Sequence, residues 1–149
     1  MALVAQFQTY CRDLHDAAIE VHVTAADANQ ADLLRALLTQ GRKLDVQNPQ
    51  PAALGSDFGR FGIQLIPALR AHDPAMADSL ESLDRLVRFR NAVAHGNESE
   101  LAGIVASGVI GTNLRSYRWY RRMLEGLVGS MDRVVGAELA SRLQIPAPW

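Results

Sequence analysis

The sequence predicts an all-α protein, folded as an antiparallel bundle of four to five helices. Apolar residues recur at intervals of three and four along most of the chain, which is the period of amphipathic helices, and no segment shows convincing strand alternation. Prolines and glycines fall in a few short clusters that separate these helical segments. The chain has 149 residues, 48% of them hydrophobic. This is enough for one buried core, so we assign 1–149 to a single helical domain.

The first predicted helix covers about Leu3–Val23, and a short link at 24–29 leads into a second helix. The second helix is expected to end at Asn48, because the proline that follows disfavours α geometry in the residue before it. The prolines and the glycine of the stretch 48–56 predict a loop. Ser56 then caps a third predicted helix.

Three further segments complete the predicted bundle. The third helix ends near His72, and a fourth occupies about Ala75–His95, where Gly96 suits the left-handed position that ends a helix. The glycine-rich segment 96–112 has room for one short helix. A long last helix covers about Asn113–Leu143, with apolar residues at the spacing of a bundle seam. Three of its residues, Gly126, Gly129 and Gly136, are expected to permit close helix approach, either within the bundle or between protomers.

Composition and charge exclude several function classes. The formal net charge is -1, so any contact with nucleic acid needs a local basic patch rather than the whole surface. Cys11 is the only cysteine; an internal disulfide is excluded, a reducing cytoplasm is expected, and helical spacing predicts a packed thiol. The sequence shows no signal peptide and no apolar run of the ~20 residues that span a bilayer. We therefore expect a soluble, cytoplasmic protein that makes no membrane contact.

The sequence predicts no metal site and no cofactor. His15 and His22 lie two helical turns apart, about 10 Å, which is too far for both to bind one metal directly. Asp16 and Glu20 have the spacing of neighbours on a helix and could hold a cation, but a solvated pair is the more common arrangement. The glycines form neither a phosphate-binding loop nor a dinucleotide-binding pattern.

One position on the fourth predicted helix breaks its apolar pattern. On a helical wheel the apolar arc of this helix comprises Leu83, Leu86, Val87, Val93 and Ala94. Arg90 falls near the middle of the arc, where an arginine is costly unless its donors are satisfied. Asn91 and His95 stack on one flank, and Asp84 lies one turn earlier on that flank. The spacing leaves two interpretations open: a buried polar cluster that ties elements together, or a site with chemistry.

A family resemblance begins at these residues. The segment LDRLVRFRNAVAHGN resembles the signature of the HEPN superfamily, an arginine, usually followed by a polar residue, with a histidine a few positions later. The upstream block NPQPAALGSDFGRFG, followed by a helix and RNAVAHG, resembles the RiboL-PSP branch of that superfamily. The resemblance covers roughly 30–100 and maps the motif onto Arg90, Asn91 and His95 without gaps.

The resemblance implies a metal-independent endoribonuclease of the toxin or antiphage type. Such proteins need no cofactor and form homodimers in which two motifs face each other, and an antitoxin or another protein encoded nearby can hold them in check. Histidine can act as base or acid near neutral pH, and arginine offers a permanent charge to phosphate. We therefore assign His95 as general acid/base, Arg90 as stabiliser of the phosphorane and Asn91 as an orienting residue.

A second candidate feature is the arginine-rich start of the last helix, LRSYRWYRRM. Arginines interleaved with Tyr117, Trp119 and Tyr120 suit single-stranded RNA, although core tyrosines beside solvated arginines would give the same pattern. The residues proposed to bind the RNA substrate are Arg88, Arg115, Arg118, Arg121 and Arg122. Two alternatives to a nuclease remain: a non-catalytic HEPN module that binds a protein partner, and a nucleotide-binding bundle in which Arg90 holds a phosphate without turnover.

Overall fold

The computed structural model describes residues 2–107, 111 and 113–149, and all regular structure within them is helical. The prediction of an all-α bundle is therefore confirmed. The elements are α1 (Ala2–Ala25), the 3-10 turn η1 (Ala28–Gln30), α2 (Ala31–Thr39), α3 (Lys43–Val46), α4 (Pro51–Phe58), the 3-10 turn η2 (Gly59–Phe61), α5 (Leu65–His72), α6 (Met76–Ala94), α7 (Glu98–Ala106) and α8 (Leu114–Leu143).

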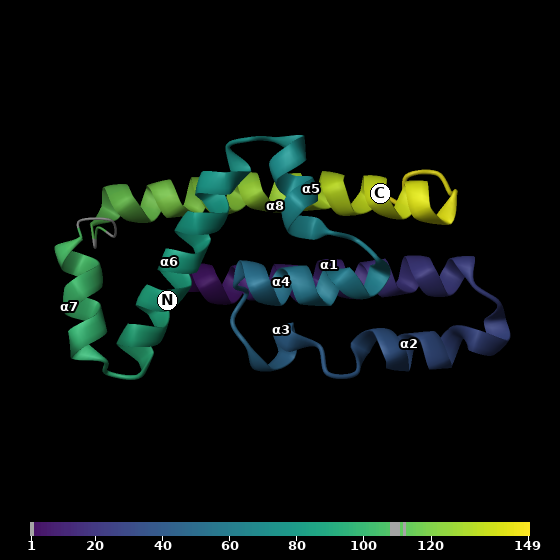
Figure 1. Ribbon diagram of the computed structural model, residues 1–149, viewed down its shortest axis with the longest axis horizontal. Coiled ribbons are helices and arrows are strands. Elements are labelled where there is room, and N and C mark those ends of the chain that lie inside the picture. The colour runs from purple at the N-terminus through teal and green to yellow at the C-terminus, as the bar shows by residue number, and fades with distance from the viewer. Residues whose placement is uncertain (1, 108–110, 112) are drawn as a thin grey trace.

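The two long helices of the bundle, α1 and α8, lie side by side (Figure 1). They run in the same direction in Figure 1, and the Tyr10 hydroxyl joins them, since it lies 3.1 Å from the Val128 carbonyl oxygen and 2.8 Å from Asp132 Oδ1. Helix α2 folds back along α1, and α5 and α6 pack on α8. The core lies between these elements and includes the fully buried Phe58, Leu83 and Met131.

The predicted second helix is divided in two by Gly41, whose φ is +68°, a conformation that favours glycine. The side chains of the next segment fix both new helix ends. Arg60 donates from Nη1 to the Gln40 carbonyl oxygen (2.6 Å) and from Nη2 to that of Gly41 (2.9 Å). Asp57 accepts hydrogen bonds from the first backbone N–H groups of α3. The division therefore depends on contacts that are remote in sequence.

The prediction of a loop over 48–56 is wrong from residue 51 onward, because α4 begins at Pro51. Proline at the first helical position loses no hydrogen bond and already has a helical φ. Ser56 consequently lies inside α4 and is not its cap. The predicted third helix is instead divided into α4, η2 and α5, with Gly62 at a φ of +74° before the last of them.

The remaining boundaries agree with the predictions to within one or two residues. Helix α6 ends before Gly96, whose φ is +62°, and α8 has Asn113 as its N-cap residue. The short helix expected in the glycine-rich segment is α7, while 108–110 and 112 lie outside the described residues.

Within one chain the α8 glycines are not the points where another helix comes closest, so that part of their interpretation is wrong, and close approach between protomers stays a prediction. A Cβ added at Gly126 would meet no atom of another residue within 4 Å, because this position faces outward. At Gly129 the nearest atoms belong to Arg133 of the same helix, and at Gly136 they belong to the Trp149 indole, 3.1 Å away. The Trp149 Nε1–H also donates to the Asp132 carbonyl oxygen at 3.2 Å, so the end of the chain folds back on α8.

Candidate functional site

The candidate site is built on the C-terminal end of α6, where the backbone makes a sharp and well-bonded stop. Two hydrogen bonds close the helix end, from Gly96 N to the Val93 carbonyl oxygen (3.4 Å) and from Asn97 N to that of Ala92 (2.9 Å). This is the Schellman arrangement, with Gly96 in the left-handed position. Asn97 then starts α7, because its Oδ1 accepts from Glu100 N at 3.1 Å. His95, the C-cap residue, is thus fixed between two helices.

Replacing Gly96 with alanine tests this helix stop. The substitution forces an L side chain into the left-handed region, and we expect it to lower the free energy of unfolding by about 1–2 kcal/mol. Gly103→Ala is a matched control, since Gly103 lies within α7, lacks a positive φ and has open space around its missing Cβ. That control should be neutral or stabilising by up to about 1 kcal/mol. Urea unfolding measures both; equal effects would contradict the assigned role of Gly96.

The side chain of Asn91 is fixed by two donors. Asn48, in the segment before α4, donates from Nδ2 to Asn91 Oδ1 at 2.7 Å, and Arg90 donates from Nη1 to the same oxygen at 3.3 Å. Both donors use the oxygen, so the amide orientation is defined by the bonds themselves. The link to Asn48 also ties the end of α6 to a segment that is remote in sequence.

Arg90 and His95 are both accessible to a ligand. Arg90 is half-buried, and within the described residues it makes no ion pair. Its remaining N–H donors are therefore not committed to a carboxylate. His95 is exposed, and its imidazole makes no hydrogen bond within the described part of the chain. The structure therefore does not enclose these two side chains in a buried, fully bonded polar cluster.

The predicted apolar arc of α6 is correct in the body of the helix and wrong in its last turn. Leu83 and Val87 are fully buried, whereas Val93 is 40% exposed and Ala94 is exposed. Ala92 is buried in their place. The reason is visible in Figure 1, where the end of α6 extends beyond the elements that cover its first turns. Arg90 therefore lies at the margin of the apolar stripe rather than in its buried middle.

The arginines proposed to bind substrate fall into two groups. Arg88 pairs with Asp84 at 3.0 Å, and Arg121 pairs with Glu125 at 2.8 Å. The other three are exposed and make no ion pair within the described residues: Arg115, Arg118 and Arg122. Figure 1 shows the start of α8 and the end of α6 at opposite ends of α7. Within one chain the structure therefore does not bring the α8 arginines beside Arg90 and His95.

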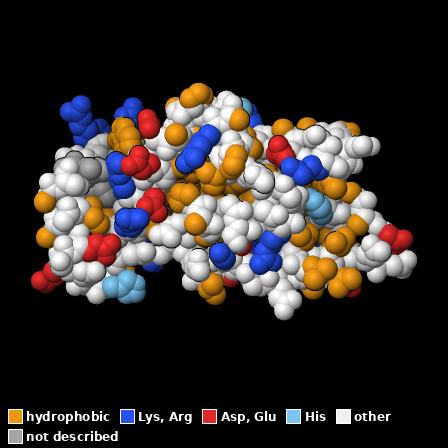
Figure 2. All heavy atoms as spheres, viewed as in Figure 1, with side chains coloured by type: hydrophobic (Ala, Val, Ile, Leu, Met, Phe, Trp, Pro, Cys, Tyr) orange, Lys and Arg blue, Asp and Glu red, His pale blue; other side chains and the backbone are white. Residues whose placement is uncertain are grey.

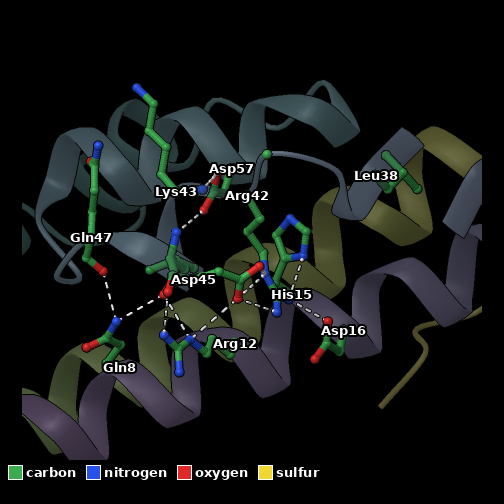
Figure 3. A network of polar contacts seen from close by, with 12 residues as sticks. Gln8, Arg12, His15, Asp16, Leu38, Arg42, Lys43, Asp45, Gln47 and Asp57 are labelled. Carbon is green, nitrogen blue, oxygen red and sulfur yellow. Dashed lines mark hydrogen bonds and ion pairs between the residues drawn. The ribbon is translucent and has the colours of Figure 1, made fainter. Parts of the chain in front are cut away.

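Sequence reasoning missed a second polar cluster, which surrounds Arg42 (Figure 3). The Arg42 side chain is 9% exposed and lies between two carboxylates, 2.5 Å from Asp16 Oδ1 and 2.8 Å from Asp45 Oδ1. Its Nη1 is also 3.4 Å from His15 Nδ1. An arginine that follows a glycine turn and precedes Asp45 by three residues was the available signal. The carboxylate of Asp16, however, comes from α1.

His15 is fully buried, which makes this cluster structural rather than catalytic. Its ring contacts Phe58 and Phe61, with centroids 5.5 and 4.8 Å away, and its Nε2 has no hydrogen-bond partner. Burial and the neighbouring charge of Arg42 both lower the pKa of His15. A neutral ring with an accepting Nδ1 fits beside the Arg42 donor. The cluster joins α1 to α3, and no substrate can reach the imidazole.

The stability of the protein should therefore depend on His15 in mildly acidic solution. Because the pKa of His15 is lowered in the folded state, the imidazole of the unfolded chain becomes protonated near pH 6.5, while that of the folded chain stays neutral there. Stability is full above that pH and should fall as the pH decreases below it, by at most about 1.4 kcal/mol per pH unit. Urea unfolding between pH 7 and pH 5.5 measures this loss. A His15→Leu variant that shows the same pH dependence would contradict it.

Other candidate ligands also have ordinary partners. Asp16 pairs with Arg42, and Glu20 pairs with Arg35 at 2.8 Å, so these two carboxylates do not form a joint site. No group of three or more His, Cys, Asp or Glu residues within the described ranges is placed to hold a metal ion.

Cys11 is fully buried as expected, and burial raises the pKa of its thiol. None of the described helices combines the length and apolar character needed to cross a membrane.

No protein-family model, curated protein or solved structure matches this chain. The resemblance to the HEPN superfamily therefore stays a prediction from the sequence motif.

Proposed function

We propose that this chain is a metal-independent endoribonuclease of HEPN type, which cleaves RNA by attack of the RNA's own 2′-hydroxyl. The observation that carries the proposal is the accessible arginine–histidine pair at the end of α6. Arg90 has donors that no carboxylate occupies within the described residues, and the His95 imidazole is exposed. These are the two functional groups that phosphodiester transesterification needs.

The reaction requires one proton removed and one proton supplied. A neutral imidazole takes the proton of the 2′-hydroxyl while its oxygen attacks phosphorus, and the bond from phosphorus to the 5′-oxygen breaks. A protonated imidazole gives its proton to that departing oxygen. The products are a 2′,3′-cyclic phosphate and a 5′-hydroxyl. Arg90 would hold the non-bridging oxygens, which gain charge in the phosphorane, through its planar fork of N–H donors.

A single motif supplies only one histidine for these two proton transfers. A homodimer with the two α6 ends facing each other would place two imidazoles and two guanidinium groups around one phosphate. The exposed position of His95 supports this arrangement, because the group is available to a second copy. Such an effector would need restraint in its host, and an antitoxin-like protein is the partner that we propose.

Asn91 would act on the reaction through Arg90. Its Oδ1 accepts from Arg90 Nη1 at 3.3 Å while Asn48 holds the same oxygen at 2.7 Å. The Arg90 guanidinium is therefore oriented by a side chain that is itself fixed. Preorganisation of this kind lowers the cost of holding a charge in position for the transition state.

The test is cleavage of a panel of single-stranded and hairpin RNAs by the purified protein, with analysis of the product ends. We expect 2′,3′-cyclic phosphate and 5′-hydroxyl ends, and an activity per subunit that rises with protein concentration as the dimer forms. Products with 5′-phosphate ends would contradict attack by the 2′-hydroxyl. A folded dimer that cleaves no RNA would favour the partner-binding module instead.

Removal of divalent metal should leave the activity unchanged. The proposed protons and charges all come from the imidazoles and from Arg90, so an excess of EDTA removes nothing that the reaction uses. The measurement compares initial rates with and without EDTA at constant ionic strength, since RNA binding depends on salt. Rates that agree within about twofold support the mechanism. A loss of most activity, restored by added magnesium, would overturn it.

A further inference from the structure

The first part of α8 carries an outward face that its helix does not need for packing. Trp119 lies on this face with an arginine on each side, Arg115 one turn before it and Arg122 one turn after it. Arg118 lies on the arginine side of this face, three residues after Arg115 and four before Arg122. The opposite side of α8 carries the buried Tyr120, Leu124 and Leu127. We call the four outward residues the α8 basic face.

The arginines of the α8 basic face differ from their neighbours in charge balance. Within the described residues Arg115, Arg118 and Arg122 make no ion pair, whereas the adjacent Arg121 is neutralised by Glu125. The first turn of α8 also contains no acidic residue. Figure 2 shows cationic side chains at this end of the molecule, with acidic side chains among them. In a chain with net charge -1, this is a local positive patch.

Trp119 adds an exposed aromatic ring to the arginines of the α8 basic face. Its side chain is 48% exposed, so part of the indole is open to a ligand. Its ring meets the ring of Tyr120 at 83° with centroids 4.9 Å apart. The two rings therefore do not stack face to face, and Tyr120, which is 5% exposed, anchors the indole at the surface.

We propose that the α8 basic face is a docking surface for single-stranded RNA. Unstacked bases stack on an exposed aromatic ring, and guanidinium groups one turn apart along a helix bind the phosphates of the same strand. A duplex hides its bases from Trp119, so the combination of an indole with unpaired arginines favours a single strand. The choice of RNA as the nucleic acid rests on the proposed function.

This docking surface is separate from the Arg90–His95 pair. The end of α6 and the start of α8 lie at opposite ends of α7 in Figure 1, and α7 has 9 residues, a length of about 13 Å. An RNA that is bound on the α8 basic face must therefore extend past α7 to reach a scissile position in the same chain. RNA binding on the α8 basic face can therefore be measured in a variant that does not cleave RNA, and RNA cleavage can be measured in a protein whose α8 basic face is unchanged.

The experiment measures RNA binding in the His95→Ala variant, so that the probe stays intact. The probe is a labelled oligouridylate of about 15 nucleotides, followed by anisotropy at several salt concentrations. Adding Arg118→Ala and Arg122→Ala should weaken binding at least about tenfold and reduce the slope of log K against log salt by about 1.4. Arg70→Ala with Arg142→Ala removes the same charge elsewhere and should leave the slope unchanged.

The tryptophan fluorescence gives an independent readout. The chain has two tryptophans, so quenching by RNA should persist in Trp149→Phe and disappear in Trp119→Leu, with an affinity loss of about tenfold. Unchanged affinity in the α8 variants, equal affinity for a duplex of the same length, or binding to phosphatidylserine vesicles but not to RNA would each overturn the proposal. RNA binding through α8 without cleavage by the wild-type protein would support this inference and contradict the proposed nuclease. Cleavage and RNA binding that are both unaffected by the α8 variants would contradict only this inference.

Discussion

The His95→Ala variant should lose RNA cleavage by at least a factor of about 10² to 10⁴, which is the usual contribution of a single general acid–base group. In the proposed dimer the substitution removes both the group that takes the 2′-hydroxyl proton and the group that supplies the proton to the 5′-oxygen. The His95 side chain is exposed and makes no hydrogen bond within the described residues. Its removal should therefore change the free energy of unfolding by less than about 0.5 kcal/mol.

Two controls make this result specific. His72→Ala removes an exposed histidine of α5, whose Nε2 lies 3.3 Å from Arg133 Nε, and should leave the cleavage rate unchanged. Arg90→Lys keeps the charge but loses the planar fork, so it should recover only part of the activity that Arg90→Ala loses. Rates are measured by the release of labelled product at matched protein concentration. Cleavage by His95→Ala at the wild-type rate would remove histidine from the mechanism.

Among single substitutions of buried polar residues, Asp57→Ala should lower the free energy of unfolding the most, by about 3–5 kcal/mol. The Asp57 carboxylate is fully buried in α4 and accepts hydrogen bonds from Lys43 N at 2.9 Å and from Leu44 N at 2.8 Å. It also lies 3.9 Å from Arg60 Nε. Alanine leaves two N–H groups at the start of α3 without their acceptor, and Leu44 is itself fully buried.

The matched control for Asp57 is Asp27→Ala. Asp27 also caps a helical element, the 3-10 turn η1, since its carboxylate accepts from Asn29 N at 2.9 Å, but it is exposed to water. The same change of net charge should therefore cost no more than about 1 kcal/mol there. Urea unfolding at neutral pH compares the two variants. A loss at Asp57 no larger than the loss at Asp27 would show that the buried hydrogen bonds contribute little to stability.

These two predictions concern parts of the chain that the sequence revealed to different degrees. Arg90, Asn91 and His95 were singled out from their spacing and from the motif that they resemble, because an arginine in an apolar pattern and a histidine five residues later are local features of one helix. The hydrogen bond from Asn48 to Asn91 joins side chains that are 43 residues apart. No local pattern predicts such a pair, so the fixed orientation of Asn91 appeared only in the folded chain.

The same contrast explains the errors in the helix boundaries. Pro51 is compatible with either a loop or a first helical turn, and its local sequence does not distinguish them. The break after α2 depends on Arg60, which donates to the carbonyl oxygens of Gln40 and Gly41 from about twenty residues away. The tertiary position of Arg60 thus selects a short α3 where periodicity predicted one continuous helix.

The sequence by itself determined the fold class, the long helices α1, α6 and α8, and the stop at Gly96. Each of these depends on interactions within one or two turns, which the order of residues specifies directly. Only the tertiary structure decided which polar groups are buried and which are accessible. It enclosed His15 and Arg42 between α1 and α3, and it left His95 and Trp119 in contact with solvent. Exposure depends on how far each helix extends beyond its neighbours, and packing between segments that are distant in sequence sets that extent.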